Sequence, residues 1–136
     1  MRVKAARRSA GILAAMTSTT TYAALTRDIS TQVAALRSDL PAVMKGFNDL
    51  SKASLSDGVL SEKTKELIAL ALGVAAHCDG CLGFHAKALV RLGATRAEVE
   101  EALAVAVHMG GGPPLMYSAN AMKAFAEFAP IPEIRS

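Results

Sequence analysis

The chain has 136 residues, of which 51% are apolar and 20% charged, so it is long enough to form one domain around its own core. This composition excludes a disordered or collagen-like chain, and the 4% of aromatic residues argues against an all-β fold. The net charge of +3 comes from residues 1–27, which hold five of the 15 basic residues and no acidic residue. The remainder contains 10 basic and 12 acidic side chains, so charge indicates no nucleic-acid partner.

Residues 1–24 differ in composition from the rest of the chain. A basic start is followed by a short apolar run over residues 11–16 and then by a stretch rich in Thr and Ser. The pattern resembles a weak secretory signal or an organelle transit peptide, and a disordered tail or an extension upstream of Met16 are the alternatives. The apolar run is shorter than the roughly 20 residues that cross a bilayer. We therefore expect one domain over residues 25–136, no membrane partner, and a cytoplasmic location unless residues 1–24 direct export or organelle targeting.

Apolar residues recur with helical spacing along the rest of the chain. The spacing predicts six helices, over about residues 28–37, 41–50, 61–76, 78–92, 95–109 and 113–128. No stretch shows the alternation of a strand, and the sequence contains no internal repeat. We therefore predict a single all-α domain.

Local signals mark where several of these helices begin and end. Ser61 can cap one helix, and Gly93 is placed just after the last turn of another. Thr95 and Glu98 match a capping box that opens the next helix. The helix after Ser61 is apolar on every face from Glu66 onward, so it should lie in the core with Glu66 as its one acid on the buried side.

The two cysteines, Cys78 and Cys81, are three residues apart, and His85 follows four residues after the second. On a helix these spacings place the two sulfurs within disulfide range and the imidazole beside Cys81. The pair lies in the predicted first turn of its helix, where the helix dipole favours a thiolate. The arrangement indicates a redox-active dithiol with Cys81 as the nucleophile and Cys78 as the partner that receives the disulfide.

Glu66 lies twelve residues before Cys78 on an otherwise apolar helix. A carboxylate in such a position needs a partner, because an unpaired buried charge costs free energy. If the two helices pack antiparallel, Glu66 can hydrogen-bond His85 and complete a Glu–His–Cys relay. The alternative is an ordinary pair with Lys63, its neighbour one turn earlier.

These residues resemble the carboxymuconolactone decarboxylase superfamily, and specifically its alkylhydroperoxidase D-like branch. The matching pattern runs from Glu66 over twelve residues to Cys78 and continues to Cys81 and His85. The later stretches Leu92-Gly93-Ala94-Thr95 and Gly110-Gly111-Gly112-Pro113-Pro114 also look like this family. The resemblance covers about residues 38–129.

The resemblance implies an alkylhydroperoxidase D-like helical bundle that assembles as a homotrimer or homohexamer. It implies a thiol-dependent hydroperoxide reductase, that is, a peroxidase or disulfide oxidoreductase with no cofactor and no metal. Cys81 would attack the hydroperoxide, Cys78 would form the disulfide, and His85 and Glu66 would relay the proton. The electrons would come from a dithiol donor, either a lipoyl protein or a thioredoxin-like partner.

The two residues between the cysteines bear on this activity. Gly80 stands where some members of the branch have a bulky residue, and Asp79 adds a negative charge that disfavours a nearby thiolate. Peroxide reduction would then be weaker or the donor different. Other interpretations stay open: a non-catalytic redox-sensing or binding module, a structural disulfide, or a zinc site formed by His77, Cys78, Cys81 and His85.

Overall fold

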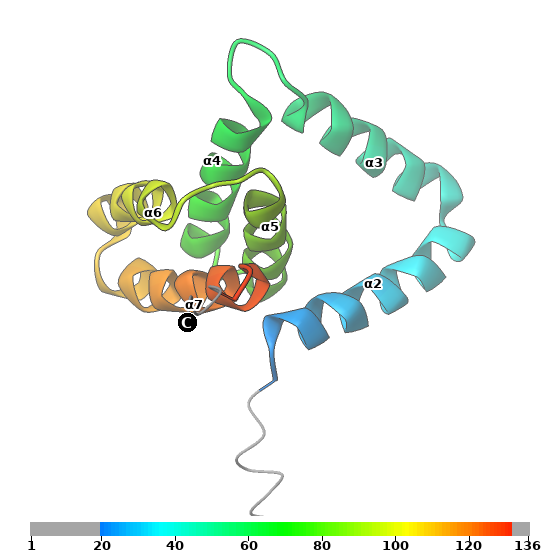
Figure 1. Ribbon diagram of the computed structural model, residues 1–136. Helices are drawn as coiled ribbons and strands as arrows, with labels where there is room; N and C mark the ends of the chain where they lie inside the picture. Colours follow the sequence, from blue (N-terminus) through cyan, green and yellow to red (C-terminus); the bar gives the residue numbers. More distant parts are fainter. Residues whose placement is uncertain (1–19, 132–136) are drawn as a thin grey trace, which may run out of the picture.

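The computed structural model describes residues 20–131, and this part of the chain folds into six α-helices without a strand (Figure 1). The helices are α2 (Tyr22–Asp39), α3 (Pro41–Leu55), α4 (Glu62–Ala75), α5 (Asp79–Arg91), α6 (Arg96–Gly110) and α7 (Gly112–Phe128). The predicted all-α fold is confirmed, and the largest shift in a boundary is at α2, which starts at Tyr22 rather than near residue 28.

Helices α4 to α7 form a four-helix bundle that encloses the core. Helix α4 contacts α5 and α6, and both of these contact α7, so the four helices surround one interior. The largest fully buried side chains are Leu70 and Val74 from α4, Leu82 and Leu89 from α5, and Val99 from α6. Each such side chain stabilises the fold by about 1.5–3 kcal/mol. The bundle therefore provides the rigid frame on which α4 and α5 carry the predicted site residues.

Hydrogen bonds at the helix starts confirm the predicted caps. Ser61 Oγ accepts the N–H of Thr64 (3.1 Å), and Thr95 and Glu98 form the predicted capping box. Lys63 Nζ donates to Glu98 Oε1 (2.7 Å), which ties the start of α6 to α4. The hydrogen bonds from Lys63 and from the backbone of Thr95 lower the pKa of Glu98 below its ordinary value, because they favour the charged carboxylate.

Helix α2 begins within residues 1–24, the segment whose composition differs from that of the rest of the chain. Thr21 caps the helix, and the backbone N–H of Tyr22 donates to Glu127 Oε2 in α7 (2.7 Å). The Tyr22 side chain is buried, and this burial, together with nearby carboxylates, raises the pKa of its hydroxyl. Residues 20–24 are thus continuous with the helical domain, whereas the rest of the predicted targeting segment lies outside the described residues.

The second half of α2 leads away from the bundle, and α3 runs back toward the loop before α4, so the two helices form an arm beside the bundle (Figure 1). Helix α3 buries no residue. Five large apolar side chains lie exposed along the arm, and we call them the arm stripe: Leu36, Leu40, Val43, Phe47 and Leu50. A row of exposed apolar side chains is typical of a surface that contacts another protein. Neither the arm nor any other helix within residues 20–131 is both long enough and apolar enough to cross a bilayer.

Candidate active site

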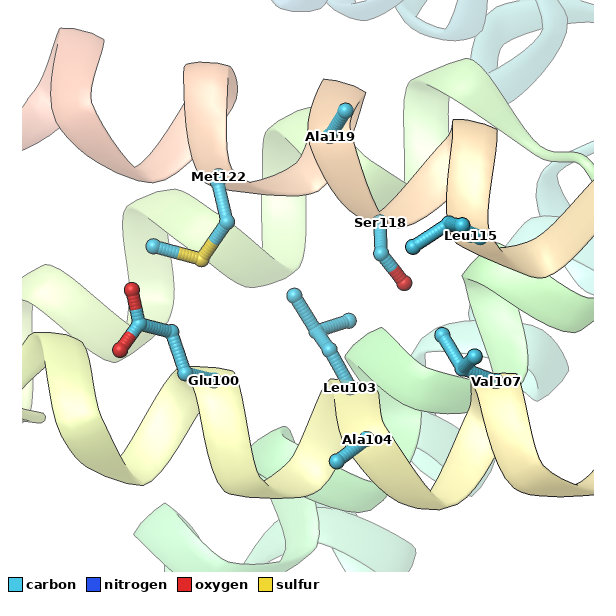
Figure 2. A pocket seen from close by; sticks show the side chains of 8 residues that line it. All are labelled: Glu100, Leu103, Ala104, Val107, Leu115, Ser118, Ala119 and Met122. Carbon is cyan, nitrogen blue, oxygen red and sulfur yellow. The ribbon is translucent and has the colours of Figure 1, made fainter.

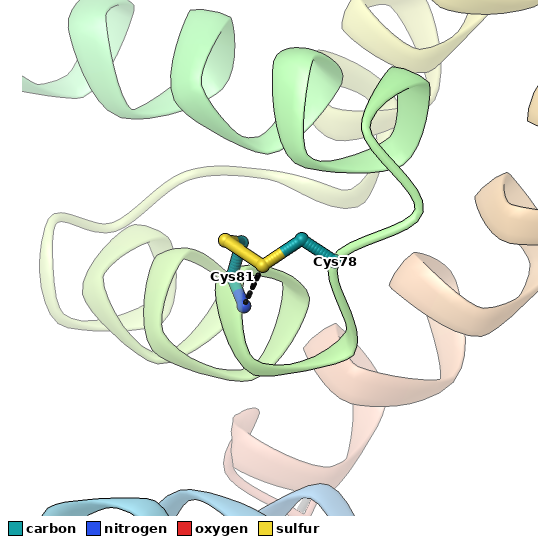
Figure 3. The surroundings of a disulfide bond; sticks show 2 residues. All are labelled: Cys78 and Cys81. Carbon is teal, nitrogen blue, oxygen red and sulfur yellow. Dashed lines mark hydrogen bonds between the residues drawn. A yellow bond between two sulfur atoms is a disulfide. The ribbon is translucent and has the colours of Figure 1, made fainter.

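The two cysteines are joined by a disulfide at the start of α5 (Figure 3). Cys78 is the N-cap residue of this helix, and its Sγ accepts the N–H of Cys81 (3.2 Å). The Cα atoms of the two residues are 5.2 Å apart, as their spacing on a helix predicted. Because Cys81 lies in the first turn of α5, the helix dipole favours its thiolate when the disulfide is reduced.

Cys81 lies directly against α4, where a glycine allows the two helices to approach. A Cβ atom on Gly73 would lie 3.0 Å from Cys81 Cβ, so a larger residue would require one helix to shift. The C=O of Gly73 also accepts the N–H of Cys78 (3.0 Å), which fixes the turn between the helices. We call this line of contact the α4–α5 seam; it is marked by Glu66 and Gly73 on α4 and by Cys81 and His85 on α5.

The other two predicted site residues meet on the same seam. His85 Nδ1 lies 2.6 Å from Glu66 Oε2, and the two side chains are 26% and 6% exposed. When Nδ1–H donates to the carboxylate, Nε2 is the ring nitrogen that can accept a proton. The alternative pairing of Glu66 with Lys63 is wrong, because Lys63 pairs with Glu98.

The seam therefore holds two pairs rather than a complete relay. Cys78 and Cys81 form one pair, and Glu66 and His85 form the other. Among the described residues, no hydrogen bond joins the His85 imidazole to either sulfur of the disulfide. The link from Cys81 to His85 stays a prediction, which depends on their separation of one helical turn.

The positions of the side chains do not favour the zinc alternative. Within residues 20–131, no three His, Cys, Asp or Glu side chains converge on a point that could hold a metal ion. His77 is turned toward α7, where its ring stacks on Tyr117 with the ring centroids 4.5 Å apart. No pattern in the sequence points to Tyr117, because helical periodicity does not relate two residues on separate helices.

Two glycines on α5 allow α2 to pack across the start of that helix. A Cβ atom on Gly80 would lie 2.8 Å from Ile29 Cδ1, and one on Gly83 would lie 2.5 Å from Thr26 Cγ2. Gly80 therefore leaves room for Ile29 of α2, which a bulky residue at position 80 would displace. The spacing of three residues between the glycines places them on one helix face, and this was the signal for a close crossing.

An open apolar groove of about 460 Å³ lies between α6 and α7 (Figure 2), and the disulfide does not line it. Apolar side chains such as Leu103, Val107 and Met122 line it, and its one carboxylate, Glu100, pairs with Arg96 (2.8 Å). No cysteine or histidine is among its lining residues. The groups capable of redox and proton-transfer chemistry gather instead at the α4–α5 seam.

The protein is thus a helical dithiol protein. Its all-α bundle carries a disulfide-linked Cys-x-x-Cys pair and a buried Glu–His pair on the same seam. The sequence model of the carboxymuconolactone decarboxylase family matches residues 41–124, from the start of α3 into α7. The protein belongs to this family.

Similar proteins agree with this assignment. A carboxymuconolactone decarboxylase family protein from Legionella pneumophila, solved in its apo form, is 53% identical, and the match covers 80% of this chain and 97% of that one with a TM-score of 0.79. A family protein from Thermotoga maritima, for which a role in the antioxidative response has been suggested, is 28% identical over 75% of this chain and 87% of its own, with a TM-score of 0.68. An uncharacterized protein of Cupriavidus necator is 43% identical over 98 residues, which are 72% of this chain and 87% of that protein.

Proposed function

We propose that the protein is a thiol-dependent hydroperoxide reductase of the alkylhydroperoxidase D-like branch. The observation that carries the proposal is the Cys78–Cys81 disulfide on the same seam as the buried Glu66–His85 hydrogen bond (2.6 Å). A dithiol supplies the two electrons that a peroxide consumes, and an acid–base pair manages the protons. The suggested antioxidative role of the Thermotoga maritima relative supports the same chemistry.

The first step starts from the reduced cysteine pair. The Cys81 thiolate attacks the terminal oxygen of the hydroperoxide, the O–O bond breaks, and the departing alkoxide takes a proton and leaves as an alcohol. The peroxide gains two electrons, and Cys81 becomes a sulfenic acid. The position of Cys81 in the first turn of α5 favours the thiolate that this step requires.

The second step forms the disulfide that the structure contains. The Cys78 thiolate attacks the sulfenic sulfur of Cys81, the sulfur–oxygen bond breaks, and the oxygen leaves as water after taking a proton. A lipoyl or thioredoxin-like dithiol then reduces the pair by two thiol–disulfide exchanges and becomes a disulfide itself. One cycle converts one hydroperoxide and one dithiol into an alcohol, water and a disulfide.

His85 is proposed as the base that takes the thiol proton of Cys81 and returns it to the leaving alkoxide. Glu66 holds the imidazole through Nδ1, which leaves Nε2 available for proton transfer. In this role Glu66 is a positioning residue, since it acts through His85 rather than on the peroxide. We place the reaction in the cytoplasm, where thiol reductants keep such a cysteine pair reducible.

The proposal is tested by steady-state consumption of an alkyl hydroperoxide with a lipoyl-type and a thioredoxin-type donor. Replacing Cys81 by Ser should abolish turnover, because no sulfur remains to attack the peroxide. Replacing Cys78 by Ser should allow one reaction per chain and leave a sulfenic acid on Cys81, which a sulfenate-specific reagent detects by mass spectrometry.

Two outcomes contradict the proposal. If the Cys81→Ser protein turns over peroxide at the wild-type rate, Cys81 does not have the proposed role. If the wild-type protein is oxidised once per chain and neither type of dithiol restores activity, the pair acts as a redox sensor, and the alternative of a non-catalytic module is correct.

We also propose that the chain forms a homotrimer or homohexamer, as its resemblance to the branch implied. The arm stripe supports this, because its side chains are 47% to 65% exposed in the single chain. A helix of 15 residues that buries nothing is only marginally stable in water, so α3 gains stability if a second copy covers it.

A further inference from the structure

The turn between α4 and α5 holds its residues in an unusual conformation. His77 has φ of +53°, and it is the one non-glycine residue with positive φ in the described part of the chain. Its N–H donates to the C=O of Val74 (3.2 Å), and the N–H of Cys78 donates to the C=O of Gly73 (3.0 Å). These two hydrogen bonds define a Schellman motif with His77 at the left-handed position.

The end of α5 repeats this motif with a glycine. Gly93 has φ of +72°, its N–H donates to the C=O of Val90 (3.1 Å), and the N–H of Ala94 donates to the C=O of Leu89 (2.9 Å). Glycine adopts this conformation freely, whereas a residue with a Cβ is strained in it. His77 therefore occupies a glycine position at a cost in conformational energy, and such strain persists only where surrounding contacts hold it.

The contact that holds His77 is its stack on Tyr117. The two rings are nearly parallel, with an interplanar angle of 11° and a centroid separation of 4.5 Å. Tyr117 belongs to α7, so the stack fastens the turn to a different helix of the bundle. The next residue is Cys78, which closes the Schellman motif of α4 and caps α5. The conformation of His77 thus constrains the backbone of Cys78.

We infer that His77 and Tyr117 are positioning residues that hold Cys78 ready to form the disulfide with Cys81. Oxidation removes conformational freedom from Cys78, and less freedom is lost when the turn is already fixed. In exchange with glutathione, the protein disulfide and two glutathione thiols give the protein dithiol and one glutathione disulfide. The stack should shift this equilibrium toward the protein disulfide. This inference rests on the proposed redox activity of the pair and does not require that the oxidant be a peroxide.

The test measures the dithiol–disulfide equilibrium of the full chain in glutathione buffers of graded ratio, or in dithiothreitol buffers if the disulfide resists glutathione. Alkylation followed by mass spectrometry gives the reduced fraction. His77→Ala and Tyr117→Leu should each raise the equilibrium constant for reduction about 2- to 10-fold, which is the range expected for loss of one aromatic stack. His77→Phe keeps a ring for stacking and should return the constant to within twofold of wild type.

Gly93→Ala is the matched control, because it introduces strain into the second Schellman motif, which carries no cysteine. It should lower the stability of the fold and leave the redox equilibrium unchanged. Two results would overturn the inference. In the first, His77→Ala and Tyr117→Leu have the helical circular dichroism of the wild type and also its redox equilibrium. In the second, Gly93→Ala shifts the redox equilibrium as strongly as those two substitutions. A shifted equilibrium in a protein without peroxidase turnover would sink the proposed function and leave this inference intact.

Discussion

Glu66 is the residue whose surroundings point most directly to proton transfer, because it is a buried carboxylate hydrogen-bonded to a histidine on the neighbouring helix. We predict that His85→Gln lowers kcat/KM for peroxide by about 10²-fold or more, the usual contribution of a general base. Glu66→Gln keeps the volume of the side chain but removes its charge, so it should have a smaller effect of about 10-fold. Both should also shift the pH profile of Cys81 alkylation toward higher pH. In His85→Gln the Cys81 thiol loses its proton acceptor, and in Glu66→Gln the imidazole loses the carboxylate that makes it more basic.

The matched control at this scale is Glu62→Gln, one turn earlier on α4. Glu62 pairs with Arg91 (2.7 Å) at the surface, where the start of α4 meets the end of α5, and it contacts neither the cysteines nor the Glu66–His85 pair. Its loss should therefore leave both activity and alkylation unchanged. An alkylation profile that His85→Gln does not move would show that the imidazole and Cys81 are not coupled.

The predictability of the site also differs from residue to residue. The Cys-x-x-Cys spacing predicted a disulfide within one helical turn, and the need to satisfy a buried acid predicted the contact of Glu66 with His85. The stack of His77 on Tyr117 could not be predicted, because it depends on where the start of α7 lies relative to the end of α4. Spacing along a helix fixes neighbours on that helix and says little about contacts between helices.

At the scale of helices, the packing of α2 on α5 depends on Gly83. We predict that Gly83→Ala lowers the free energy of unfolding by about 1–3 kcal/mol, because the added methyl would lie 2.5 Å from Thr26 Cγ2. Thr26 cannot yield easily, since it is buried and its hydroxyl donates to the C=O of Tyr22 (2.9 Å). Urea denaturation at a fixed protein concentration measures the change.

Gly46→Ala in α3 is the comparison, because a Cβ atom there has no neighbour within 4 Å. Replacing glycine by alanine at such an exposed helix position should stabilise the protein by about 0.5–1 kcal/mol. If both substitutions change the stability equally, α2 does not depend on a close approach to α5.

The extents of the helices were partly predictable from the sequence. Ser61, Gly93 and the capping box at Thr95 marked helix ends, because these residues satisfy backbone groups locally. The first six residues of α2 were missed, since the hydrogen bond from Tyr22 to Glu127 and the burial of Tyr22 are tertiary contacts. Propensity alone does not show that such a segment joins the core.

For the molecule as a whole, we predict that the arm stripe is the surface that joins the copies in the proposed oligomer. Replacing Phe47 and Leu50 together by Glu should shift the proposed oligomer to a monomer. Both side chains are exposed in the single chain, by 64% and 62%, and the oligomer would have to bury the new charges. Light scattering coupled to size-exclusion chromatography gives the mass. The control replaces Val59 and Leu60 by Glu in the loop between α3 and α4, where apolar side chains are also exposed, and should keep the wild-type mass. A wild-type chain that is monomeric at micromolar concentration, or an arm variant with the wild-type mass, would show that the arm stripe is not the surface joining the copies.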